Sequence, residues 1–210
     1  MGDDRDDAVA GVERDLAAYY QQEAADRAAR ALDPRRVAVR TAFLARLRGR
    51  RGRLLDLGIG PGRDAATFAA AGIPLVGVDL AVEHARRARS TGARVVVATV
   101  RGLPFGDGTF AALWTMSTLM HVPDAAIAGV LAELRRVLLP GSLAAVGVWG
   151  GPDVEHRSDI DVLDPPRFFS RRSDERWLSL LTTLGSVEEF ETWGRGSNDF
   201  WYQCATVTRT

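Results

Sequence analysis

Two aspartates and three glycines stand at a spacing that suits ligand binding. In "RLLDLGIGPGRDA", an apolar run that contains Asp56 is followed by Gly58, Gly60 and Gly62 at alternate positions. A second apolar run, "IPLVGVDL", carries Asp79, 21 residues after Gly58. Glycines let a backbone adopt unusual dihedral angles and let a ligand approach closely. A carboxylate at a strand end can accept ribose hydroxyls or face a cation. These residues predict a turn that holds a ligand.

The residues around the turn separate three kinds of ligand. A triphosphate-binding loop needs a lysine, and all 27 basic residues of this chain are arginine. A dinucleotide turn needs glycine where Arg63 stands, and Asp56 would repel a pyrophosphate. S-Adenosyl-L-methionine carries both an ammonium group and a ribose, which match Asp56 and Asp79. We therefore predict this cofactor, and we expect no metal because the histidines and acids lack ligand spacing.

The elements that must position these residues alternate along the chain. Apolar runs alternate with amphipathic stretches, and the apolar runs lie at 53–58, 73–80, 93–100, 110–117 and 142–149. The last amphipathic stretch has apolar residues at helical spacing from Asp124 onward. Two further runs close the sequence, joined by "GRGS", which is short enough only for a hairpin. We predict an α/β fold: a seven-stranded, mostly parallel sheet with helices on both faces and an antiparallel last strand.

The predicted organisation is one domain with an N-terminal addition. Residues 1–11 are expected to be a flexible N-terminus, and residues 12–48 a helical cap of two helices broken at Pro34. Residues 49–210 are expected to form the S-adenosylmethionine-binding domain itself.

Several stretches resemble the class I S-adenosylmethionine-dependent methyltransferases. "LLDLGIGPGRDA" and "LVGVDLAVEHARRA" are similar to the first two motifs of that family, and "LPFGDGTFAALWT" to its usual "LPF-DGSFD-V" segment. "LMHVPD", "LAELRRVLLPGSL" and "FFSRRSDERWLSLLTTLG" resemble the segments that follow, so the likeness runs over nearly the whole domain.

The resemblance implies a role for each matching position. The turn residues would line the methionine part of the cofactor, Asp79 the ribose and Leu80 the adenine, while Asp56 would orient the amino end. The residues implied to bind the cofactor are Tyr20, Asp56, Gly58, Ile59, Gly60, Gly62, Asp79, Leu80, Thr99, Val100, Thr115 and Met116.

One of these positions departs from the family pattern. Many relatives have an acidic residue after the third strand that accepts from the adenine amino group, and Thr99 stands there in this chain. A hydroxyl accepts such a bond without charge assistance, so we expect weaker binding, and the backbone N–H of Val100 remains for the adenine ring.

The acceptor side offers one candidate catalytic residue. His121 follows the fourth apolar run in "STLMHVPD", at the edge where ligands bind, and an imidazole titrates in a useful range for a general base. The alternative is that His121 caps or packs against the next helix. His84 lies among arginines and is expected to be exposed to solvent.

Two segments could cover the acceptor. An N-terminal helix closes over the cofactor in similar enzymes, which gives roles to Tyr19 and Tyr20. The long, polar, Pro-rich segment after 149 could add an aromatic wall with a cation. The expected substrate-binding residues are Tyr19, Trp149, Arg167 and Phe168. The alternative for the tyrosines and phenylalanines is core packing and loop docking.

Composition limits the remaining classes. Formal net charge is zero and the sequence pI is about 6.8, so no global field favours nucleic acid or an anionic membrane. The acidic start "MGDDRDDAVAG" lacks a secretory pattern, and a cytoplasmic protein is expected. The partner is expected to be a small-molecule acceptor, and the oligomeric state stays undetermined.

The leading interpretation is a methyltransferase that acts on O, N or C of a small organic acceptor, such as a natural product. Two alternatives keep the cofactor site: a non-methylating enzyme of cyclase-like type, and a non-catalytic pseudoenzyme. A dinucleotide oxidoreductase ranks below them because of Asp56 and Arg63.

Overall fold

The computed structural model describes residues 3–194 and 199–210. Its helices are α1 (Asp3–Ala29), α2 (Pro34–Leu47), α3 (Arg63–Ala70), α4 (Val82–Arg89), the 3-10 helix η1 (Leu119–His121), α5 (Asp124–Val137) and α6 (Asp174–Leu181). Its strands are β1 (Leu54–Leu57), β2 (Leu75–Asp79), β3 (Arg94–Val97), β4 (Phe110–Met116), β5 (Leu138–Gly150), β6 (Val154–Arg157), β7 (Phe168–Arg171), β8 (Ser186–Trp193) and β9 (Trp201–Thr208).

Seven of these strands form one sheet in the order β3-β2-β1-β4-β5-β9-β8. The strands from β3 to β5 pair in parallel, and β9 pairs antiparallel with both β5 and β8. This confirms the predicted α/β fold with an antiparallel last strand. The predicted "GRGS" connection falls mainly on residues 195–197, which lie outside the described residues.

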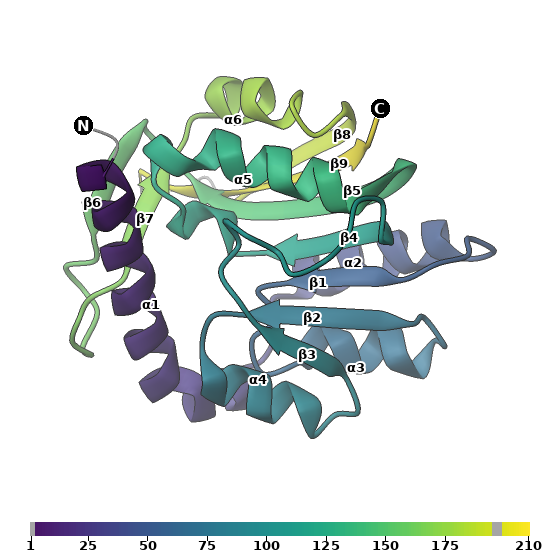
Figure 1. Ribbon diagram of the computed structural model, residues 1–210, viewed down its shortest axis with the longest axis horizontal. Coiled ribbons are helices and arrows are strands. Elements are labelled where there is room, and N and C mark those ends of the chain that lie inside the picture. The colour runs from purple at the N-terminus through teal and green to yellow at the C-terminus, as the bar shows by residue number, and fades with distance from the viewer. Residues whose placement is uncertain (1–2, 195–198) are drawn as a thin grey trace.

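Helices cover both faces of the sheet (Figure 1). One face packs on α5 and α6, where Val130, Leu134 and Trp177 are buried in the larger core cluster. The other face packs on α2 and α3, through Phe43 and Phe68. Strands that are buried on both faces read as continuous apolar runs, which is why β1, "LLDL", is buried at every position.

The first two helices follow the predicted break. The side chain of Asp33 accepts a hydrogen bond from the backbone N–H of Arg35 at 2.7 Å, and Pro34 occupies the first turn of α2. Both features favour a helix start. The structure differs at the beginning, where α1 starts at Asp3 although we expected a flexible segment over residues 1–11. Val9 is buried, so this end of α1 is packed onto the domain.

α1 runs across the edge of the sheet toward which the parallel strands point (Figure 1). A small antiparallel sheet, β6–β7, lies beside it and was not predicted, because we expected the segment after 149 to be a long loop. The carboxyl edge of a parallel sheet is where ligands bind in such folds, so α1 and β6–β7 frame that region.

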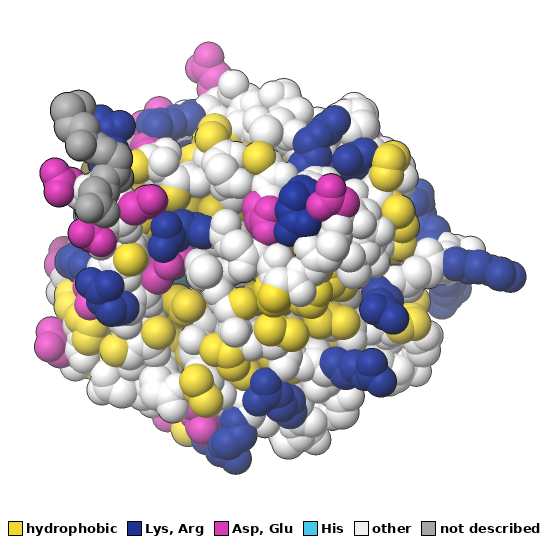
Figure 2. Space-filling view, in the orientation of Figure 1, with side chains coloured by type: hydrophobic (Ala, Val, Ile, Leu, Met, Phe, Trp, Pro, Cys, Tyr) yellow, Lys and Arg dark blue, Asp and Glu magenta, His cyan; other side chains and the backbone are white. Residues whose placement is uncertain are grey.

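The surface carries mixed charge. Figure 2 shows arginine side chains spread over one face, several beside acidic side chains, rather than gathered into one patch. In the described part of the chain, no helix combines the length and the apolarity needed to cross a membrane.

Candidate active site

The glycine turn follows β1, and its three glycines serve different purposes. Gly58, Gly60 and Gly62 have φ values of 70°, 57° and 87°, a region that side chains rarely adopt. A Cβ on Gly58 would lie 2.0 Å from Oγ1 of Thr118, and one on Gly62 would lie 3.0 Å from Cα of Ala88. A Cβ on Gly60 would meet nothing within 4 Å. Packing therefore requires two of the glycines, and Gly60 opens onto free space.

That free space belongs to a pocket between the turn and α1. Its lining comes from α1, the glycine turn, the ends of β2, β3 and β4, and the η1 segment. The residues that form it are Val9, Glu13, Leu16, Tyr20, Arg27, Arg36, Gly58, Ile59, Gly60, Pro61, Arg63, Asp64, Val78, Asp79, Leu80, His84, Ala98, Val100, Arg101, Met116, Ser117, Thr118, His121, Val122 and Pro123.

Asp79 ends β2 and is held at the floor of the pocket. Its Oδ2 accepts from the N–H of Gly60 at 2.8 Å, and its Oδ1 accepts from the N–H of Ala81 at 2.9 Å. Each carboxylate oxygen has a second lone pair. The two bonds fix the carboxylate beside the glycine turn, and Oδ2 keeps acceptor capacity for a hydroxyl.

His84 contradicts the expectation of an exposed side chain. Only 3% of its surface is accessible, because α4 turns this residue toward β2. Its Nδ1 lies 3.3 Å from Oδ1 of Asp79, and its Nε2 has no hydrogen-bond partner among the described residues. A buried nitrogen without a partner, in a residue that lines the pocket, fits a ligand beside Asp79.

Asp56 does not line the pocket, although the resemblance placed it at the amino end of the cofactor. It is buried beneath the turn, and its Oδ2 has no partner among the described residues. Burial, together with the charges of Asp64 and Asp79, raises the pKa of this carboxyl well above its ordinary value. A raised pKa disfavours the charged form of Asp56 that an ammonium group would need.

Asp64, in the first turn of α3, was not singled out from the sequence. It accepts from Arg36 at 2.5 Å, from Arg40 at 2.8 Å and from the indole nitrogen of Trp114 at 3.0 Å. Burial opposes its charge, but the two guanidinium groups prevail and lower its pKa. Asp64 thereby ties α2 to the sheet and holds Arg36 at the pocket wall.

One end of the pocket is rich in arginine. Arg27, Arg36 and Arg63 all line it. Arg63 donates to the backbone carbonyl of Arg30 at 2.7 Å. Its pKa is lowered by burial and then by the charges of Arg36 and Arg27. An anion placed among these groups would relieve their mutual repulsion, so this end suits a carboxylate.

His121 ends η1 and contacts two other parts of the chain. Its Nδ1 lies 2.6 Å from the carbonyl of Phe168, and its Nε2 lies 2.6 Å from the hydroxyl of Tyr20. The carbonyl can only accept, so Nδ1 carries the proton and Nε2 accepts from Tyr20. Burial lowers the pKa of His121 to about 3, which keeps the imidazole neutral.

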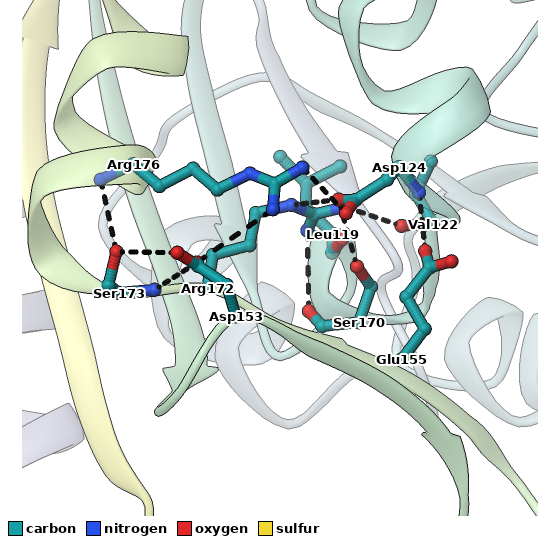
Figure 3. A network of polar contacts seen from close by, with 9 residues as sticks. All are labelled: Leu119, Val122, Asp124, Asp153, Glu155, Ser170, Arg172, Ser173 and Arg176. Carbon is teal, nitrogen blue, oxygen red and sulfur yellow. Dashed lines mark hydrogen bonds and ion pairs between the residues drawn. The ribbon is translucent and has the colours of Figure 1, made fainter.

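A buried arginine braces the segment around His121 (Figure 3). Arg172 follows β7, and its guanidinium donates to the carbonyls of Leu119 and Val122 at 3.4 and 2.8 Å. It also donates to the carboxylate of Asp124 at 2.9 Å. These bonds clamp the backbone on both sides of His121 to the end of the β6–β7 sheet.

The expected substrate-binding residues are not part of the pocket lining. Tyr19 and Phe169 flank the guanidinium of Arg167, whose carbon lies 4.8 and 5.3 Å from the two ring centres. Asp161 pairs with the same arginine at 2.5 Å. Trp149 packs on the rings of Phe200 and Tyr202 instead. None of the four expected residues, Tyr19, Trp149, Arg167 and Phe168, is among the described pocket residues, and Phe168 contributes only its carbonyl to His121.

The expected cofactor residues divide into two groups. Those that line the pocket are Tyr20, Gly58, Ile59, Gly60, Asp79, Leu80, Val100 and Met116. Those that do not are Asp56, Gly62, Thr99 and Thr115. Thr115 is buried in the sheet, and Thr99 points its hydroxyl at Glu13 of α1. The residues that sequence reasoning missed, Glu13, Arg27, Arg36, Arg63 and His84, reach the pocket from helices.

Fold and site together define a class of protein. A sheet of this order, with a glycine turn after β1 and an aspartate at the end of β2, is similar to that of the class I S-adenosylmethionine-dependent methyltransferases. Residues 54–141 match the sequence model of the family described as "Methyltransferase domain", which supports the same class. S-Adenosyl-L-methionine is the cofactor of this class.

Two relatives match the same part of the chain. An "Uncharacterized methyltransferase" of Mycobacterium sp. (strain JLS) is 40% identical over 111 residues, which are 51% of this chain and 43% of the relative. The "27-O-demethylrifamycin SV methyltransferase" of Amycolatopsis mediterranei (strain S699) is 31% identical over 104 residues, or 45% of this chain and 38% of the relative. The chain thus matches less than half of the length of either relative.

A solved structure matches more of the fold. It is the 1,6-didemethyltoxoflavin-N1-methyltransferase of Burkholderia thailandensis, with bound 1,6-didemethyltoxoflavin and S-adenosylhomocysteine. The TM-score is 0.66 at 24% identity, and the match covers 82% of this chain and 77% of that chain. At this identity the likeness concerns the fold.

Proposed function

We propose that this protein transfers a methyl group from S-adenosyl-L-methionine to O, N or C of a small organic acceptor. The observation that carries the proposal is the pocket at the glycine turn, where Gly60 leaves open space beside the Asp79 carboxylate. Two of the proteins that this chain resembles carry a small-molecule substrate in their names, 27-O-demethylrifamycin SV in one case and 1,6-didemethyltoxoflavin in the other.

The pocket residues fit the cofactor group by group. Asp79 accepts from a ribose hydroxyl through Oδ2, with the free nitrogen of His84 beside it. The arginine-rich end, formed by Arg27, Arg36 and Arg63, takes the carboxylate of the methionine part. Leu80 offers an apolar wall to the base.

When bound, the cofactor supplies an electrophilic methyl group on a sulfonium with a good leaving group. The chain's own residues then have two tasks, to align the acceptor and to accept its proton. Tyr20 lines the pocket and donates its hydroxyl proton to Nε2 of His121. A hydroxyl acceptor can therefore give its proton to the Tyr20 oxygen while the Tyr20 proton passes to His121.

The carbonyl of Phe168 supports this direction of proton movement. It holds the Nδ1 proton of His121 and stabilises the imidazolium that forms when Nε2 is protonated. His121 thus acts as the base through Tyr20. Arg172 holds the backbone on both sides of His121 through the carbonyls of Leu119 and Val122.

The experiment is mass spectrometry of reaction mixtures that contain the protein, cofactor with a deuterated methyl group, and a panel of small phenols, amines and polyketides. The proposal expects a product heavier by one labelled methyl group, together with an equal amount of S-adenosylhomocysteine. A changed acceptor without S-adenosylhomocysteine would indicate the cyclase-like alternative. Cofactor binding without turnover across the panel would favour a non-catalytic protein.

A further inference from the structure

α1 supplies a carboxylate close to the position after β3, where the family pattern has an acidic residue and this chain does not. The position after β3 holds Thr99, and its hydroxyl donates to Oε1 of Glu13. Arg101 also grips Glu13, from Nε to Oε1 at 3.1 Å and from a terminal nitrogen to Oε2 at 3.0 Å. The Glu13 side chain is only 18% exposed, so these three donors hold it in place at the end of the sheet.

Glu13 belongs to the pocket lining, and its carboxylate has acceptor capacity to spare. Glu13 lines the pocket together with Leu80, Ala98 and Val100, whereas Thr99 does not. Its Oε1 accepts two bonds and its Oε2 only one. A carboxylate oxygen has two lone pairs, so Oε2 can accept one more donor from the pocket.

The neighbours of Glu13 indicate what that donor is. Asp79 and His84 fix the ribose position at the end of β2, and β3 is the next strand in the sheet. A base attached to that ribose reaches the ends of β2 and β3, where Leu80 and Val100 provide apolar walls. The group of adenine that a carboxylate can recognise is its exocyclic amine.

We propose that Glu13 is the residue that reads the adenine amino group, and that α1 thereby carries part of the cofactor's specificity. The inference rests on the proposed function and goes beyond it. It assigns the role of the acidic residue that this chain lacks after β3 to a residue of α1. This helix comes before the sheet in the sequence and lies across its edge in the structure. Base recognition then requires α1 to be docked, which couples closure of the helix to the presence of an adenine.

A purely structural role for Glu13 makes a different prediction. If its bonds to Arg101 and Thr99 only dock α1, their loss weakens every pocket ligand by the same factor. Asp6 provides a matched control, because it is a second carboxylate of α1 that contacts Arg101, at 3.5 Å, and its side chain is 83% exposed. Asp6 is not among the pocket residues.

The test measures, by calorimetry, the affinities for S-adenosylhomocysteine and S-inosylhomocysteine, in which an oxo group replaces the amino group. The wild type is expected to prefer the adenosyl compound about tenfold or more, since a carboxylate accepts from an amine and repels a carbonyl oxygen. Glu13→Gln, whose amide can donate to the oxo group, should reduce this ratio to about one to three. Asp6→Asn should keep the wild-type ratio.

The outcomes separate this proposal from the proposed function. If the wild type binds neither nucleoside, the proposed function fails and the role of Glu13 fails with it. If the wild type binds and discriminates, and Glu13→Gln keeps the full ratio even with lower affinities, Glu13 is only a docking residue and the further proposal alone is overturned. A wild type that binds both compounds equally also overturns it.

Discussion

The hydroxyl of Tyr20 lies 2.6 Å from Nε2 of His121, although 101 residues separate them in sequence. The contact joins α1 to the segment after β4 across the pocket. It also assigns the protons, because the Phe168 carbonyl holds the Nδ1 proton and leaves Nε2 as the acceptor. In the proposed reaction the tyrosine oxygen meets the acceptor, and the histidine is the base behind it.

We expect Tyr20→Phe and His121→Gln each to lower the turnover number about a hundredfold with a hydroxyl acceptor, because each breaks the path of the proton. Affinity for S-adenosylhomocysteine, measured by calorimetry, should change little. Tyr19→Phe is the control, since Tyr19 packs on Arg167 outside the pocket. If Tyr20→Phe turns over like the wild type and only the Michaelis constant rises, the pair is a wall rather than a relay.

The pKa of about 3 for His121 predicts a pH-dependent stability. An unfolded histidine titrates near 6.5. Below that pH the unfolded state binds more protons than the folded state, so the free energy of unfolding decreases as the pH is lowered. The contribution of His121 between pH 7 and pH 5 is about 2 kcal/mol. Urea unfolding of wild type and His121→Gln at both values measures it, and equal losses in the two proteins would refute the buried neutral imidazole.

Gly60 and Gly72 form a matched pair for the turn. Both have positive φ, and a Cβ on either meets nothing within 4 Å, so alanine costs each site a similar strain of about 1–2 kcal/mol. Only Gly60 lines the pocket. Gly60→Ala should weaken S-adenosylhomocysteine about tenfold or more while Gly72→Ala binds normally. Equal affinities in the two variants would show that the ligand does not bind beside the turn.

The role of Asp56 differs between the family pattern, which gives it a charge for the cofactor, and the structure, in which it is buried beneath the turn. Its raised pKa means that the folded state holds a proton that the unfolded state loses, so this residue costs stability as the pH rises above the ordinary carboxyl value. Asp56→Asn should therefore reduce the loss of unfolding free energy between pH 5 and pH 8, and calorimetric affinity for the cofactor product should stay within about threefold. A loss of tenfold or more would restore the charged role that the resemblance implied.

The sheet was predictable because β1 to β5 read as apolar runs, with β1 and β4 almost fully buried, while the helices between them show one apolar stripe. Asp79 was predictable because β2 places it at the carboxyl edge beside the glycine turn. Both features depend on local sequence. They follow from the period of the apolar residues and from the position of a charge at the end of a run.

The wall of the pocket was less accessible to sequence reasoning. α1 presents Val9, Glu13, Leu16, Tyr20 and Arg27 to the pocket at helical spacing, but its many alanines and charges hide that stripe. His84 was misjudged because its arginine neighbours suggested a solvated helix, whereas its spacing from Asp79 turns the imidazole inward. The β6–β7 pairing depends on contacts between distant residues and carries no short-range turn signal.

The most direct test of the cofactor assignment is calorimetric titration of the wild-type protein with S-adenosylhomocysteine and, separately, with NAD. The account predicts saturable binding of S-adenosylhomocysteine at one site and no heat from NAD. It also predicts a weakening of about tenfold or more in Asp79→Asn, which loses charge-assisted bonds to the ribose. Binding of NAD at comparable affinity, or the same affinity for S-adenosylhomocysteine in wild type and Asp79→Asn, would contradict it.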